Sequence, residues 1–214
     1  LEFRRVLFRS DAVSGGGNVT CLARVFGGNA LAVADSAGVV RVLFATRKPD
    51  AAAADGLQMA VAKEFPAARG GQAARVTALA ASPRSRLLGV ADASGGMRLV
   101  QTTTGATAAS LPGDSAGSPD AAVRQLLITP RENMLLAAAD GHLTAWTLQA
   151  GYPEVSWRSL FGRVWYEKYP APVHAWETTG HESFEPKFGL VPLIFGTLKA
   201  TLYSMLFATP IAIL

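Results

Sequence analysis

The chain has few of the residues from which catalytic and metal sites are built. Of its 214 residues, one is cysteine and three are histidine. The single cysteine, Cys21, excludes an internal disulfide and any zinc site made of cysteines, and its place in an alternating apolar run indicates a small core residue of a strand. The sequence also lacks a Gly-x-Gly-x-x-Gly fingerprint, a Walker loop and a Ser/His/Asp or Cys/His set. We therefore expect no catalytic residue and no cofactor.

The residues that could ligate a metal ion are concentrated in one short segment. They are His174, Glu177, His181, Glu182 and Glu185. Imidazole and carboxylate groups are common metal ligands, but the spacing here matches no recognised ligand pattern. The sequence therefore predicts no metal site.

Charged residues are also sparse, at 17% of the chain, and their net charge is +4. Three of the arginines, Arg4, Arg5 and Arg9, lie within the first ten residues, and the remaining charges are scattered. Nucleic-acid binders usually carry a basic stripe or patch, often with interleaved aromatic residues. We expect no nucleic-acid partner.

The first ten residues, LEFRRVLFRS, join abruptly to Asp11. They lack the apolar core and the small-residue cleavage site of a signal peptide, and they resemble a translated sequencing-adapter junction. We expect residues 1–10 to be a non-native artefact that has replaced the natural start, and we leave them out of the fold prediction.

A pattern of three apolar runs separated by turns occurs three times between Val19 and Leu148. In each unit the opening valine precedes an aspartate by 16, 16 and 17 residues, and a glycine follows the aspartate. Aspartate accepts backbone hydrogen bonds across a turn, and glycine adopts positive φ without a steric cost. We predict a structural role in these turns for Asp35, Gly38, Asp92, Gly95, Asp140 and Gly141.

The second unit predicts four short strands, at residues 76–81, 86–91, 97–102 and 107–111. Four strands in a repeat of about 40 to 50 residues is the blade pattern of a WD40-like β-propeller. An irregular β-sandwich is the alternative, but the repeated internal spacing favours blades. We therefore predict a mainly β fold with about three blades in residues 11–150. Since closed propellers have about 4 to 8 blades, we expect the others upstream.

Residues 151–187 are expected to form a connector. Aromatic and aliphatic residues recur at spacings of three and four from Pro153 to Tyr169, which predicts an amphipathic helix capped by Ser156. The basic residues on its other face suit a lipid-water interface. Packing of this helix on the last blade remains an equal alternative.

The last stretch, from Phe188 to Leu214, carries a single charged residue, Lys199. A lipid-spanning helix needs about 20 mostly apolar residues, so we predict that residues 188–214 form a membrane-spanning helix. No basic cluster or polar loop closes the run, and we expect the apolar domain to continue beyond Leu214.

This stretch and the residues before it have a distinctive order: a polar tetrapeptide, then a proline, a Gly-Thr pair, a lysine and a late proline. The residues are Phe184, Glu185, Pro186, Lys187, Pro192, Gly196, Thr197, Lys199 and Pro210. Over about 30 residues the sequence resembles the start of the transmembrane core of bacterial phosphate ABC transporter permeases. The resemblance is to the long variant of the C-type subunit, which has a large extracytoplasmic insert before this helix.

The resemblance implies a fragment of a permease subunit of an importer for inorganic phosphate. Its implied partners are a second permease subunit, ATPase subunits and a phosphate-binding protein. Its implied place is the bacterial inner membrane, with residues 11–187 outside the cytoplasm and with Glu185 and Lys187 at the outer interface. The alternative is a membrane-tethered extracytoplasmic propeller that serves as an interaction scaffold without transport. A propeller enzyme would need polar groups converging at a channel mouth, whereas the units supply mostly alanine, leucine and valine.

Overall fold

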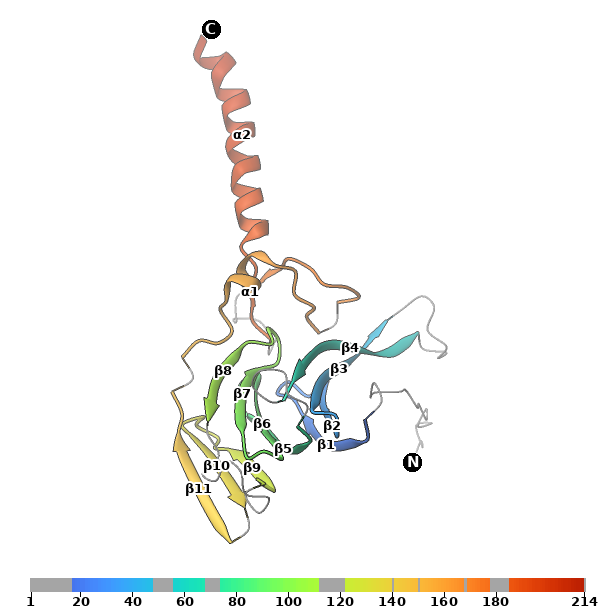
Figure 1. Cartoon of the computed structure of the whole chain (residues 1–214). Helices are drawn as coiled ribbons and strands as arrows, with labels where there is room; N and C mark the ends of the chain where they lie inside the picture. The colour runs from blue at the N-terminus through green and yellow to red at the C-terminus, as the bar shows by residue number, and fades with distance from the viewer. Residues whose placement is uncertain are drawn as a thin grey trace, which may run out of the picture.

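The computed structural model describes residues 17–47, 56–67, 74–111, 122–139, 141–149, 151–167, 169–177 and 185–213. Three antiparallel sheets follow one another along the chain (Figure 1). The first contains β1 (Val19–Arg24), β2 (Ala30–Asp35), β3 (Val39–Arg47) and β4 (Leu57–Pro66). The second contains β5 (Val76–Ala81), β6 (Leu87–Asp92), β7 (Met97–Gln101) and β8 (Thr107–Leu111). The third contains β9 (Gln125–Ile128), β10 (Met134–Ala139) and β11 (His142–Thr147).

Each sheet is a meander in which consecutive strands pair, and the first strands of neighbouring sheets, β1, β5 and β9, lie next to one another. This is the arrangement of propeller blades around an axis lined by their first strands. The predicted fold class is confirmed: the chain is mainly β, a partial propeller followed by a terminal apolar helix. The predicted strands of the second unit agree with β5 to β8 to within one residue at either end.

The cores lie between the sheets and consist largely of small aliphatic side chains. One cluster joins the first and second sheets, around Val42, Phe44 and Leu88. Two further clusters join the second and third sheets. The close approach is visible at Gly89 of β6, where a Cβ atom would lie 2.8 Å from the Leu126 side chain of β9. All six residues of β6 are buried, and its only charged residue is the turn aspartate Asp92 at its end.

The predicted helix over residues 153–169 is wrong in extent. The helix α1 covers only Trp157–Phe161, although Ser156 caps it as predicted, with a capping box that includes Ser159. The helix ends because Gly162 takes an extended conformation. Val164 then forms an antiparallel bridge to Val173 through two backbone hydrogen bonds of 3.0 Å.

The apolar spacing in this region therefore reflects packing on the propeller rather than one helical face. Trp165 contacts Phe44 edge-on, with ring centroids 5.7 Å apart, and Val164 and Tyr166 are buried. Trp157 is 80% exposed. For Trp165, the structure has the second of the two alternatives, packing on the propeller. The contact is with the first blade, whereas the prediction named the last one.

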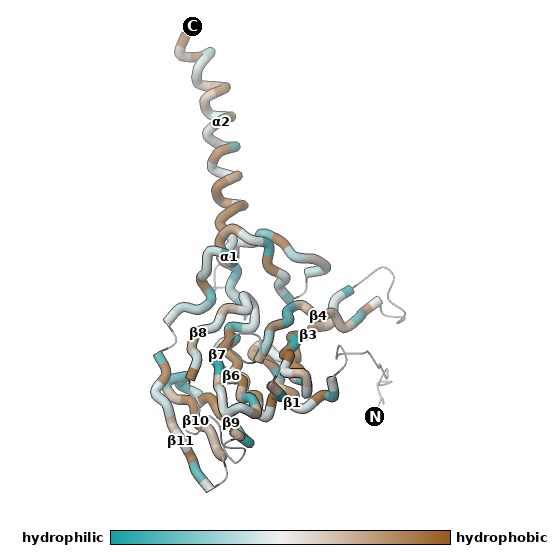
Figure 2. Tube along the Cα trace, in the orientation of Figure 1, coloured by the Kyte–Doolittle hydropathy of each residue, from teal (hydrophilic) through white to brown (hydrophobic). Residues whose placement is uncertain are grey.

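The terminal helix α2 covers Val191–Ile213 and projects from the β-sheets as a single rod (Figure 1). It begins three residues later than predicted, because Phe188 belongs to β13 (Lys187–Phe188), which pairs with β12 (Trp176–Glu177). Pro192 lies in the first turn, where a missing N–H costs little. The helix is apolar over most of its length (Figure 2).

Candidate functional site

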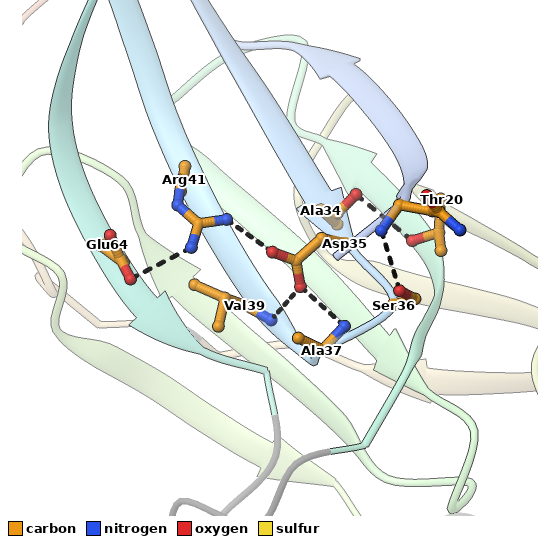
Figure 3. Close-up of polar contacts among 9 residues, drawn as sticks. Thr20, Ala34, Asp35, Ser36, Ala37, Val39, Arg41 and Glu64 are labelled. Carbon is orange, nitrogen blue, oxygen red and sulfur yellow. Dashed lines mark hydrogen bonds and ion pairs between the residues drawn. The ribbon is translucent and has the colours of Figure 1, made fainter. Parts of the chain in front are cut away.

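The first Asp/Gly turn is a self-contained polar network (Figure 3). Asp35 Oδ1 accepts hydrogen bonds from the backbone N–H groups of Ala37 (3.0 Å) and Val39 (2.9 Å). Asp35 Oδ2 forms an ion pair of 2.6 Å with Arg41 Nη1, and Arg41 Nη2 pairs with Glu64 at 3.3 Å. Burial alone would raise the pKa of Asp35, but the Val39 hydrogen bond and Arg41 outweigh it, and the pKa is lowered. Both carboxylate oxygens of Asp35 thus have partners within the turn and its own sheet, which indicates a structural role.

The second turn repeats the backbone part of this network. Asp92 Oδ1 accepts from the N–H groups of Ser94 (2.8 Å) and Gly96 (3.3 Å). Gly38 and Gly95 have positive φ of 80° and 81°. In the third turn Gly141 has φ of 75°, and Asp140 lies outside the described residues.

Sequence reasoning missed the arginines that accompany these aspartates. Arg41 and Arg98 each follow the turn aspartate by the same interval, a spacing that the repeats contain and that could have revealed them. Their contacts differ, because Arg98 Nη1 donates to the Pro66 carbonyl of the neighbouring sheet at 2.6 Å. Arg41 thus secures its own turn, and Arg98 ties two blades together.

Among the described residues, several buried charges meet at the junction between the propeller and the segment that leads into α2. Arg86, from the turn between β5 and β6, is 2% exposed. Its Nη1 lies 2.5 Å from Glu167 Oε1, and its Nη2 lies 3.6 Å from Glu185 Oε1. Glu185 also accepts hydrogen bonds of 2.8 Å from the Thr103 hydroxyl and from the Glu167 N–H. Paired and hydrogen-bonded in this way, the buried charges fix one orientation of the segment.

A second ion pair lies beside the first. Lys187 Nζ pairs with Glu177 Oε2, and it also lies 5.3 Å from the ring centroid of Tyr169. Burial, followed by the nearby Glu185 carboxylate, raises the pKa of the Tyr166 hydroxyl to about 12. The tyrosine therefore stays neutral across the physiological range.

These contacts change the placement expected for two residues of the family motif. Glu185 is 5% and Lys187 is 8% exposed, so their side chains are buried in the junction and do not face an open outer interface. Phe184 lies outside the described residues. Pro186 stands between the two ion pairs and is half-buried.

The remaining motif residues lie on α2, where none of the described side chains is buried. The hydroxyls of Thr197, Thr201 and Thr209 donate to the carbonyls of Leu193, Thr197 and Met205 at 2.7 to 2.9 Å. Such bonds satisfy a polar side chain within its own helix, which suits an apolar surrounding. Lys199 Nζ lies 5.6 Å from the Tyr203 ring centroid. With 23 residues, α2 is about 34 Å long, and by length and composition it could cross a membrane.

The candidate metal ligands are not assembled by the described part of the chain. Glu177 and Glu185 are engaged in ion pairs with Lys187 and Arg86. His174 has a buried Nδ1 atom without a hydrogen-bond partner. His181 and Glu182 lie outside the described residues, and among those described no group of three or more potential ligands occurs.

A groove of about 570 Å³ runs along the first strands of the three sheets. Leucines dominate its lining, and Leu22 and Leu127 are 61% and 57% exposed. Cys21 also borders it and packs only partly against the core, so it is less buried than expected. The groove has the apolar character of a contact surface rather than of a reaction site.

A scan against models of protein families found no match, and neither did a comparison with curated proteins. Among solved structures, the chain is similar to the β-propeller domain of Cps50 (Swd1) from Myceliophteria thermophila, with 16% identity and a TM-score of 0.47. It is also similar to the WD40 repeats of RRP9, with 14% identity and a TM-score of 0.48. The alignments cover 61% and 64% of this chain, which spans only 40% and 37% of those chains. Sequence identities this low indicate a similarity of fold and nothing about function.

Proposed function

We propose that this chain is a membrane-tethered β-propeller module that serves as an interaction scaffold. The observation that carries the proposal is the continuity from the propeller through the buried ion pairs of Arg86 and Lys187 into α2. The helix has no buried side chain among those described and is long enough to cross a lipid bilayer. A fixed junction next to such a helix would hold the propeller at a defined position on a membrane.

Tethering is tested by alkaline carbonate extraction of membranes from cells that express the chain. We expect the chain to stay in the membrane pellet. A Leu198→Arg/Leu202→Arg variant adds two charges to exposed positions of α2 at about 2.5 to 3.5 kcal/mol each on insertion scales, and it should be released. Release of the original chain would contradict the proposal.

The extracytoplasmic side is proposed from the resemblance of the terminal segment and can be tested at Cys21, the single cysteine of the chain. A membrane-impermeant maleimide should label it in intact spheroplasts to the same extent as in lysed ones. A Leu22→Cys variant, at a position 61% exposed, provides a more accessible thiol. Labelling that appears only after lysis would place the propeller in the cytoplasm.

A second candidate function, a permease subunit for inorganic phosphate, is favoured by the polar residues of α2. Lys199 and the close Gly196–Thr197 pair are unusual in a helix that faces lipid alone, and they suit contacts with further helices. Together with the motif residues Pro192 and Pro210, they support a helix that belongs to a larger membrane domain. The implied partners are the second permease subunit, the ATPase subunits and the phosphate-binding protein.

The transport candidate is tested in cells that carry the complete gene. We expect deletion of the gene to abolish uptake of radiolabelled phosphate and the original gene to restore it, whereas a Gly196→Leu form should not. Unchanged uptake after deletion would refute transport and leave the scaffold.

A further inference from the structure

A cavity of about 330 Å³ lies between β4 of the first blade and the segment that leads into α2. Lys63 and Glu64 line it from β4, Arg158 lines it from α1, and Arg163 and Trp165 line it from the strand-like segment that follows. Cavities of about 300 Å³ and more are typical of small-molecule sites. None of the residues in the ion pairs of the junction lines this cavity.

The charges around this cavity do not balance. Lys63, Arg158 and Arg163 contribute three positive charges, and the described residues that line it include one carboxylate, Glu64. Arg41 already holds that carboxylate at 3.3 Å. Between described residues, none of the three cations forms an ion pair.

The position of Lys63 in this cavity disfavours its charged form. Burial first, and then the positive charge of Arg158, lower the pKa of its amine, and the Glu185 carboxylate opposes this shift only in part. Like charges held close together in a partly desolvated space raise one another's free energy, and an anion between them lowers it. The fold thus maintains a positive pocket whose energy an anion would reduce.

The position of the cavity is compatible with two sources of such an anion. The Leu190 N–H at the start of α2 donates to the Leu160 carbonyl of α1 at 2.7 Å. The α1 arginine, Arg158, therefore lies close to the point where α2 would enter a bilayer. A lipid headgroup and a free anion in solution are both within reach there.

We propose that this cavity is a binding site for a phosphate group, either inorganic phosphate or the headgroup of an anionic phospholipid. Arg158 and Arg163 provide guanidinium forks that match phosphate oxygens, Lys63 provides a point charge, and Trp165 contributes an aromatic ring to the lining. The site goes beyond the proposed function and does not depend on it, because a scaffold and a permease subunit would both retain it.

The test is calorimetric titration of the full chain in a non-ionic detergent. One arm uses inorganic phosphate, and the other uses dihexanoyl phosphatidylglycerol with dihexanoyl phosphatidylcholine as the zwitterionic reference. The variant is Arg158→Gln/Arg163→Gln, at two exposed side chains. The matched control is Arg24→Gln/Arg75→Gln, which removes the same charge at exposed positions outside the cavity. Circular dichroism checks that each variant is folded.

We expect the variant to bind at least about tenfold more weakly than the original chain, since charge-assisted hydrogen bonds are lost, and the control to bind normally. Binding of inorganic phosphate would identify a free anion, and binding of phosphatidylglycerol alone would identify a lipid headgroup. Failure of both ligands to bind, or equal weakening in the variant and the control, would overturn the proposal.

Discussion

At the scale of single residues, buried charge is concentrated where the propeller meets the terminal helix. Arg86 neutralises Glu167 and approaches Glu185, and all three side chains are at least nine-tenths buried. A buried ion pair adds little over an apolar pair, but removal of one partner leaves the other uncompensated. The stability of the junction therefore depends on both signs of charge being present.

We predict that Arg86→Met lowers the free energy of unfolding by about 3 to 5 kcal/mol. Urea denaturation measures this loss. The control is Arg75→Met, at an exposed arginine, which should change the free energy of unfolding by no more than about 0.5 kcal/mol. Addition of Glu185→Gln should recover part of the loss because the two residues share one network. Equal effects of the two single arginine variants would contradict this account.

A second residue prediction concerns Asp35, whose pKa in the folded chain lies below its ordinary value of 3.8. A carboxyl with a lowered folded pKa contributes stability that is complete above the unfolded pKa and is lost as pH falls through the folded one. Stability should thus fall as the pH drops below 3.8. Urea titrations across this range should give a shallower fall for Asp35→Asn, and an unchanged pH profile would argue against the ion pair with Arg41.

At the scale of elements, the turns and strands were largely predictable from sequence and the connector was not. A strand such as β5 is set by local signals, an alternating run followed by a turn. The end of α1 at Gly162 depends on Val164 pairing with Val173, a contact that periodicity does not encode. The burial of Glu185 was equally hidden, because its partner Arg86 belongs to the second blade, far from Glu185 in the sequence.

The turn glycines offer a comparison that separates backbone strain from crowding. Gly38 and Gly105 both have positive φ, of 80° and 72°. A Cβ at Gly38 would overlap the Ala74 backbone, whereas nothing lies within 4 Å of one at Gly105. We expect Gly105→Ala to cost about 1 kcal/mol from strain alone, and Gly38→Ala to cost at least about 2 kcal/mol more. Thermal unfolding measures the free-energy cost of each substitution. Equal costs would show that the Ala74 backbone can move away from the added methyl group with little loss of stability.

A further prediction concerns Lys199 and the insertion of α2 into a membrane. A lysine near the middle of a spanning helix opposes insertion by about 2.5 to 3.5 kcal/mol, although a long stem can carry the amine toward the interface. Lys199→Leu should therefore raise the inserted fraction of α2 in a translocon reporter assay. Thr201→Leu is the control, since its hydroxyl is already satisfied within the helix, and it should change insertion much less. An equal rise in both variants would indicate that Lys199 is not at membrane depth.

At the scale of the whole molecule, the three sheets differ in how well they are covered. β6 is buried along its entire length between neighbouring strands and sheets. β11 pairs with β10 on one side, and no described strand pairs with its other side. Leu143 of β11 is 73% exposed.

Hydrogen exchange should reveal this gradient in the intact chain. Amides in well-covered core strands open only in global unfolding, and edge amides open locally. We expect the amides of β6 to exchange at least about a hundredfold more slowly than those of β11 that face away from β10. Mass spectrometry with single-amide resolution measures the difference, and comparable protection would mean that something covers β11.

The contacts of the junction also bear on the order in which the chain assembles. Arg86 and Glu167 are 81 positions apart, and Thr103 and Glu185 are 82 positions apart. Contacts across such long loops form late, because the entropy of loop closure must be met before they are gained. A chain grows from its N-terminus, so the blades exist before α2 has been made. The blades would thus fold first from hairpins, and their attachment to the segment beside the emerging helix would follow.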